Sequence, residues 1–138
     1  MMKLSKILLT FTLLLLLISC STTKRKLIPT ANKGGYLLNL NTNLNLSEKN
    51  ITGRVFDIKT NALLGGIELT VGCKKTQTNT NGEFSFKLKE FSNGALFIKA
   101  SGIGYKIVET DFINMKNKNI LNIDFYLAED DRPFINCQ

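Results

Sequence analysis

Apolar and polar residues alternate in short segments along most of the chain after residue 50. The alternation is clearest over residues 67–71, 84–88 and 121–127, where every second residue is apolar. Side chains of a β-strand point to the same face at this period of two. Turn-forming residues separate the segments at intervals of about ten residues. The pattern therefore predicts an all-β sandwich of antiparallel strands around one core.

Two turn segments interrupt this pattern. Residues 79–82 read Asn-Thr-Asn-Gly, and residues 93–94 read Asn-Gly. These residue types tolerate the left-handed backbone of tight turns, so we expect Gly82 at a position of positive φ. Helical periodicity is missing after residue 19, which makes helical enzymes and nucleotide-binding α/β folds poor fits.

Residues 1–19 have a different pattern, typical of a signal peptide. Lys3 and Lys6 precede an apolar run over residues 7–18, which is too short to cross a bilayer. The run ends in Leu17-Ile18-Ser19-Cys20, which resembles the lipobox of bacterial lipoproteins. The resemblance implies that Cys20 is acylated and the leader removed. The alternative is ordinary cleavage near Ser21, which would leave a secreted protein.

The residues after the lipobox bear on localisation. Ser21 stands where inner-membrane lipoproteins of the enteric type carry Asp, so the resemblance implies delivery to the outer membrane. Lys24-Arg25-Lys26 differs from the acidic run that some lipoproteins use for export to the surface. We expect the protein in the cell envelope, anchored by lipid in the outer membrane with its domain facing the periplasm. Surface exposure is the alternative.

Residues 20–50 are predicted to form a lipidated N-terminus and a flexible tether. The stretch 21–35 has no periodicity and contains Pro29 and Gly34-Gly35. Residues 36–46 alternate Tyr or Leu with Asn, which favours one extra edge strand. Because Asn is a poor strand former, an Asn-rich linker is the alternative interpretation.

Residues 51–129 resemble the carboxypeptidase-regulatory-like domain, and residues 130–138 follow as a C-terminal tail. The pattern of that family runs G-x-V-x-D, T, P-L-x-G-A, T-D-x-D-G-x-F and G-Y. The matching residues are Gly53, Val55, Asp57, Thr60, Gly66, Asn81, Gly82, Phe84, Gly104 and Tyr105. Two departures are Leu63 in place of proline and Asn79 in place of Asp. The resemblance implies a transthyretin-like Greek-key β-sandwich of about seven antiparallel strands, and it implies no catalysis.

Most of these motif residues are expected to be scaffold residues. Asp57 is expected to cap the turn that runs through Thr60. Tyr105 is expected at the edge of the core, with its ring buried and its hydroxyl hydrogen-bonded. Laying the calcium-loop template over residues 79–82 puts Gln77 and Leu88 at the two strong ligand positions, so a β-turn fits better.

Composition and charge narrow the function further. The chain of 138 residues has no His, which excludes Ser-His-Asp and Cys-His nucleophile systems and every imidazole metal site. We expect no catalytic residues, no metal and no cofactor. Removing the leader with its two lysines lowers the formal net charge from +7 to +5. This modest charge, scattered over alternating strand faces, argues against nucleic acid as a partner.

Cys73 and Cys137 are the two remaining cysteines. With Cys20 acylated they form an even pair in an oxidising compartment, and a Cys73–Cys137 disulfide would pin the tail to the sheet. Two free thiols are the alternative.

Three functions remain open at this stage. The first is a non-catalytic binding or interaction module for an envelope protein or a polysaccharide, anchored through the N-terminal lipid. The second is a structural spacer or assembly factor for an outer-membrane receptor complex, and an enzyme is the third. A patch of exposed Tyr and Phe beside Asn or Asp would favour ligand binding, and a bare strand edge would favour pairing with a protein partner. The oligomeric state does not follow from the sequence.

Overall fold

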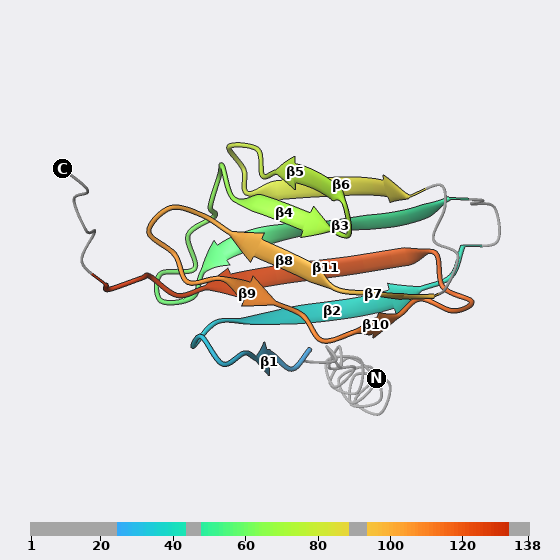
Figure 1. The fold of residues 1–138 in the computed structure, drawn as a ribbon, viewed down its shortest axis with the longest axis horizontal. Coiled ribbons are helices and arrows are strands. Elements are labelled where there is room, and N and C mark those ends of the chain that lie inside the picture. The colour runs from blue at the N-terminus through green and yellow to red at the C-terminus, as the bar shows by residue number, and fades with distance from the viewer. Residues whose placement is uncertain (1–24, 44–47, 89–93, 133–138) are drawn as a thin grey trace, which may run out of the picture.

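The computed structural model describes residues 25–43, 48–88 and 94–132 (Figure 1). Eleven strands and no helix are assigned within these ranges. No helix among these residues is therefore long and apolar enough to cross a membrane. The predicted leader and Cys20 lie outside the described residues, so the signal peptide and the lipidation stay predictions.

Sheet A has five strands in the order β1-β2-β11-β3-β6. It contains the three longest strands of the described residues, and β11 among them shows the alternating burial of one inward and one outward face. Its members are β1 (Ile28–Pro29), β2 (Gly35–Asn41), β11 (Ile120–Leu127), β3 (Lys49–Asp57) and β6 (Glu83–Leu88).

Sheet B has four shorter strands in the order β5-β4-β8-β9, and it lies in front of sheet A in Figure 1. A separate antiparallel pair joins β10 to β7. The strands of sheet B are β5 (Lys74–Gln77), β4 (Glu68–Val71), β8 (Ile98–Ser101) and β9 (Val108–Glu109), and the small pair consists of β7 (Ala95–Leu96) and β10 (Ile113–Asn114).

The core lies between the two sheets. Phe125 at its centre is fully buried, and its ring lies 6.3 Å from that of Tyr36 and 6.1 Å from that of Phe84. Sheet B contributes the fully buried Leu69 and Ile98 from the opposite side. The predicted all-β sandwich is confirmed, because the apolar positions of the alternating segments are the ones that meet in this core.

One strand pair differs from the antiparallel expectation. β3 and β11 run parallel, with Val55 beside Phe125 and Ile51 beside Leu121. Alternation shows which residues face the core, but it does not show the direction of a neighbouring strand. Several of the eleven strands are only two residues long, which accounts for the difference from the expected number of about seven.

The extra strand predicted over residues 36–46 is confirmed for residues 36–41, whereas residues 28–29 and 35, predicted as flexible tether, also lie in strands. The alternating segment forms β2 over Gly35–Asn41 and pairs along its length with β11. β2 is not the edge strand, because β1 pairs with its other side over two residues. Burial of Tyr36 at 3 % exposure outweighs the poor strand propensity of Asn. Residues 44–46 of the predicted strand lie outside the described residues.

Candidate interaction surface

Strand register arranges the outward side chains of sheet B in three rows. We call this surface the sheet-B face, and each row crosses it in the order β5, β4, β8, β9. The groove row contains Gln77, Glu68, Ser101 and Ile107; the middle row contains Lys75, Thr70, Lys99 and Glu109; the turn row contains Cys73, Gly72 and Phe97.

Exposed apolar side chains gather along this face. Five large hydrophobic residues are exposed within the described ranges, and all except Leu63 lie on the sheet-B face or at its ends. Phe97 and Phe112 form an edge-to-face pair at one end, with ring centroids 5.8 Å apart. Ile103, which is 92 % exposed, and Ile107 lie at the other end. Apolar surface collected in this way marks interaction sites in soluble domains.

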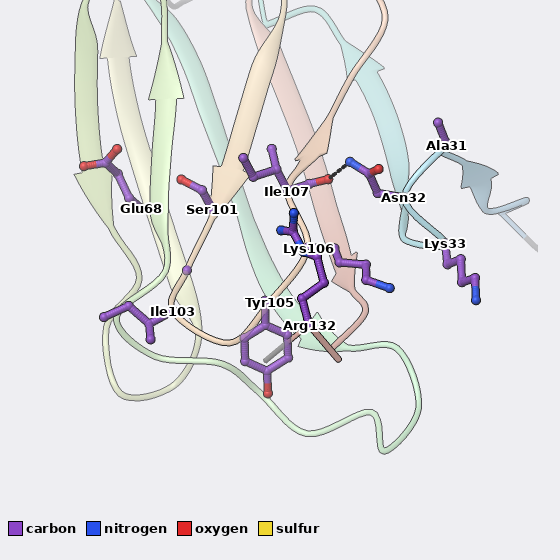
Figure 2. A pocket seen from close by; sticks show the side chains of 11 residues that line it. Ala31, Asn32, Lys33, Glu68, Ser101, Ile103, Tyr105, Lys106, Ile107 and Arg132 are labelled. Atoms are coloured by element: carbon purple, nitrogen blue, oxygen red, sulfur yellow. Dashed lines mark hydrogen bonds between the residues drawn. The ribbon is translucent and has the colours of Figure 1, made fainter. Parts of the chain in front are cut away.

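A groove of about 770 Å³ lies at the Ile103 end of the face (Figure 2). Its walls come from the β1–β2 turn, the end of β4, the β8–β9 loop and Arg132. The Asn32 side chain donates a hydrogen bond of 2.8 Å to the carbonyl oxygen of Ile107, which joins two of these walls. Lys106 pairs with Asp131 at 3.0 Å. The groove therefore combines apolar side chains with charged groups, of which Lys106, Glu68 and Arg132 form ion pairs.

Asp57 and Tyr105 connect the two layers beside this groove. Asp57 Oδ1 accepts hydrogen bonds of 2.8 Å from the backbone N–H groups of Lys59 and Thr60, the turn-capping contact expected from the sequence. The Tyr105 hydroxyl donates to Asp57 Oδ2 at 3.3 Å. The Thr60 N–H lowers the pKa of Asp57, whereas burial and the nearby Asp57 carboxylate raise the pKa of Tyr105. Both side chains are used to hold β3 against the β8–β9 loop.

The glycines of the family motif have conformational or steric roles. Gly66, Gly82 and Gly104 have φ values of 75°, 68° and 80°, which side chains rarely adopt. A Cβ on Gly53 would overlap the carbonyl oxygen of Ile123 on the adjacent strand β11. The backbone conformation and the lack of space for a Cβ therefore explain why glycine occupies these positions.

The other motif residues also have structural places. Val55 and Phe84 lie in the core. Asn79 Oδ1 accepts 2.9 Å hydrogen bonds from the N–H groups of Asn81 and Glu83, so residues 79–83 form a closed turn. Within the described residues, no group of three or more Cys, Asp or Glu side chains is arranged to hold a metal ion.

The cysteines are only partly described. Cys73 is exposed in the turn between β4 and β5. Cys137 lies outside the described residues, so the Cys73–Cys137 disulfide stays a prediction.

The outer face of sheet A, the sheet-A face, is polar and bonded to itself. The Thr52 hydroxyl donates to Asn122 Oδ1 at 2.7 Å, and Arg54 pairs with Asp124 at 3.8 Å. Its two aromatic rings are half-buried: Phe56 stacks on Tyr126 with centroids 5.1 Å apart, and the Arg54 guanidinium lies 5.2 Å from the Phe56 centroid. Most of the polar side chains of this face therefore bond to one another, although Asn50 Oδ1 is buried without a hydrogen-bond partner.

Sequence reasoning missed the apolar residues of the sheet-B face, although a signal was present. Phe97 lies between the apolar residues Leu96 and Ile98, and Phe112 precedes Ile113. Where apolar residues are consecutive in a strand, one of them must point away from the core. In both cases the structure buries the neighbours and exposes the phenylalanine.

The fold is that of a small β-sandwich domain. The model of the CarboxypepD_reg-like domain family matches residues 51–133, and the chain belongs to this family. The match agrees with the resemblance found in the sequence motifs. No curated protein matches the chain.

One similar solved structure is a crystal structure from Bacteroides fragilis NCTC 9343, described as a "putative membrane-associated protein of unknown function". The sequence identity is 16 % and the TM-score is 0.45, over 64 % of this chain. The chain spans 30 % of the length of that protein.

Proposed function

We propose that the protein is a non-catalytic, lipid-anchored protein of the cell envelope whose β-sandwich binds another envelope component through the sheet-B face. The main support for this proposal is that four of the five exposed large hydrophobic side chains of the described residues lie on this face and its ends. Exposed apolar side chains gathered on one face are common where a domain contacts a partner.

A non-catalytic role is supported by how the motif residues are used. Asp57, the buried carboxylate of the motif, is occupied by backbone N–H groups and by Tyr105. Its pKa is lowered, which is the reverse of what a general acid requires. The chain also contains no His to act as a base.

The position of the N-terminal segment supports an orientation in the envelope. Arg25 lies at the sheet-A face, where it lines a groove of about 760 Å³ together with Thr52 and Asp124. Cys20 precedes Arg25 by five residues, which span at most about 18 Å. An acyl anchor on Cys20 would therefore keep the sandwich close to the bilayer without covering the sheet-B face. In the proposed outer-membrane location, the sheet-B face is open to the periplasm.

The chemistry of the sheet-B face favours a protein over a polysaccharide. Ile103 and Ile107 supply aliphatic surface, which fits the apolar centre of a protein interface. Phe97 and Phe112 are edge-to-face at 86°, so they do not form one flat platform for sugar rings. A role as structural spacer or receptor assembly factor would use the same face.

Site-specific photo-crosslinking in native cells tests the binding face. A photoreactive residue at Phe112 should trap one specific protein, and the adduct should be lost in an Ile103→Ser background. The matched control places the same residue at Asn39, on the sheet-A face, where we expect no such adduct. Equal trapping at both positions would contradict the proposal, as would no protein adduct at Phe112 combined with binding on a polysaccharide array.

Mass spectrometry of the mature N-terminus tests the anchor separately. The expected product begins at Cys20 and has the mass of a diacylglycerol-modified, acylated cysteine. An unmodified terminus near Ser21 would show that the protein is secreted without an anchor.

A further inference from the structure

We propose that the sheet-B face binds a second copy of this chain, in a face-to-face dimer whose two-fold axis runs along the strands between β4 and β8. This inference rests on the proposed function of the sheet-B face as an interaction surface, and it names the partner. It follows from the order of side chains in the three rows of that face.

A two-fold axis along the strands reverses the order of strands in the second copy. β5 then faces β9 of the partner subunit, and β4 faces its β8. Each row faces the same row of the partner, because the ends of the strands do not exchange. Contacts in such an interface occur twice, once from each copy.

The charges of the middle row are complementary in this arrangement. Lys75 on β5 faces Glu109 of the partner subunit, and Glu109 faces the partner's Lys75. Both residues are exposed. Lys75 Nζ also lies 3.0 Å from Glu68 Oε1 of its own chain, so in the dimer it would be shared between two carboxylates. Lys99 faces Thr70 of the partner subunit, so it meets an uncharged side chain instead of a second cation. Opposite charges at matched positions set the register of an interface.

In the turn row, an exposed aromatic ring lies opposite a position without a side chain. Continuing the β4–β8 register by one residue places Phe97 beside Gly72, and in the dimer Phe97 faces the partner's Gly72. A Cβ built on Gly72 meets no atom within 4 Å, so the surface at this glycine is open. Phe97 and Phe112 would fill this space from the second copy. The dimer therefore covers the aromatic end of the face.

A two-fold axis perpendicular to the strands is unfavourable. It keeps the order of strands and exchanges their ends, so the middle row faces itself. Lys75 would then lie opposite the partner's Lys75, and Glu109 opposite the partner's Glu109. Like charges in contact cost several kcal/mol. The charges of the middle row therefore favour a two-fold axis that runs along the strands.

The size of the face predicts a weak, concentration-dependent dimer. Four strands and three rows, which span five residues from Glu68 to Gly72, give a footprint of about 19 Å by about 17 Å. This is smaller than the patch of about 800 Å² per partner in a typical stable interface. A shared membrane would raise the effective concentration of anchored copies, so a weak contact suffices there.

Sedimentation velocity of the full chain, purified in detergent, tests the inference with charge-reversed variants. The unsubstituted protein should show a monomer–dimer equilibrium over a concentration series. Lys75→Glu and Glu109→Lys should each weaken association at least about tenfold, because each puts like charges in contact twice. An equimolar mixture of the two variants should recover dimer, because both contacts are then between opposite charges. Lys87→Glu, the same charge change on the sheet-A face, should leave association unchanged.

Gly72→Asn gives a second test of dimer formation. Asn tolerates positive φ, and its side chain would occupy the space that the partner's Phe97 fills in the dimer. We expect loss of dimer with little change in melting temperature. A chain that is monomeric at every concentration would overturn the inference, as would a dimer that tolerates all three substitutions. If the Phe112 crosslink traps a different protein while the chain is monomeric, this inference fails and the proposed function stands. If neither association nor crosslinking depends on the sheet-B face, both fail.

Discussion

The two outer faces of the sandwich arise from the same alternation but differ in what they leave exposed. On sheet A, strands of seven to nine residues run side by side, and their outward Thr, Asn, Arg and Asp side chains bond to one another. On sheet B, strands of two to four residues are interrupted at Phe97 and Phe112, which remain exposed.

This difference shows how a binding surface can be built beside a stable sheet. Long paired strands bury or satisfy nearly every group they carry, so they supply stability. Short strands with breaks leave apolar side chains exposed to water, which is unfavourable in free energy. A partner that covers these side chains removes this unfavourable contact with water. We therefore expect substitutions on the sheet-A side to affect stability more, and substitutions on the sheet-B face to affect association more.

The largest contrast is expected between two glycines, one in each sheet. Gly53→Ala should lower the free energy of unfolding by about 3 kcal/mol, because the new Cβ overlaps the backbone of β11. In Gly72→Ala the new Cβ would meet open space, so the free energy of unfolding should fall by only about 1 kcal/mol. This loss arises because residue 72 has a φ of 57°, which is unfavourable for alanine. Urea denaturation of both variants measures the difference. Equal losses would contradict the view that the strands of sheet A are packed more tightly.

The next largest effect on stability is expected at Asp57, which connects the two layers through Tyr105. Asp57→Asn should cost about 1.5–3 kcal/mol at neutral pH, because it weakens hydrogen bonds to a charged group. The folded state holds the pKa of Asp57 below the ordinary value of 3.8, chiefly through the Thr60 N–H. The stabilisation is therefore complete above that pH and is lost as the pH falls through the lowered pKa.

Melting temperatures of both proteins, measured from neutral pH down into this acid range, check the linkage. The unsubstituted protein should lose stability more steeply than Asp57→Asn, so that the difference between them shrinks on acidification. Parallel curves would contradict the role given to the carboxylate. Tyr105→Phe, which removes only the bond to Asp57 Oδ2, should have the smaller effect of about 1 kcal/mol.

A substitution at Arg54 tests how much the polar contacts of the sheet-A face contribute to stability. Arg54→Ala removes the pair with Asp124 and the contact with the Phe56 ring, and should cost about 0.5–1 kcal/mol. The matched change on the other face, Lys75→Ala, removes one exposed pair with Glu68 and should cost less than about 0.5 kcal/mol. Denaturation at low and high salt measures both, and a larger loss for Lys75→Ala would reverse the comparison.

Phe112 should have the smallest effect on stability. Its side chain is 78 % exposed, so Phe112→Ser should change the free energy of unfolding by less than about 0.5 kcal/mol. The same change should reduce the fluorescence of a hydrophobic dye bound to the folded protein, because it removes exposed apolar surface. A strong loss of stability would show that Phe112 belongs to the core and not to the interaction surface.

The sequence by itself determined the strands of the core and the turns of the family motif. Burial of Phe125 and Leu121 followed from a period of two, and the positive φ of Gly82 and the cap at Asp57 followed from local chemistry. These features depend on residues close together in the chain, and residue type and spacing therefore specify them.

Only the tertiary structure decided the remaining features. β2 joins sheet A because pairing with β11 buries Tyr36 and partly buries Leu38 and Leu40, and β3 lies parallel to β11 although about 70 residues separate them. The gathering of Phe97, Phe112, Ile103 and Ile107 on one face depends in the same way on which strands become neighbours. Periodicity describes one strand at a time, whereas a sheet and its surface are properties of strands brought together by packing.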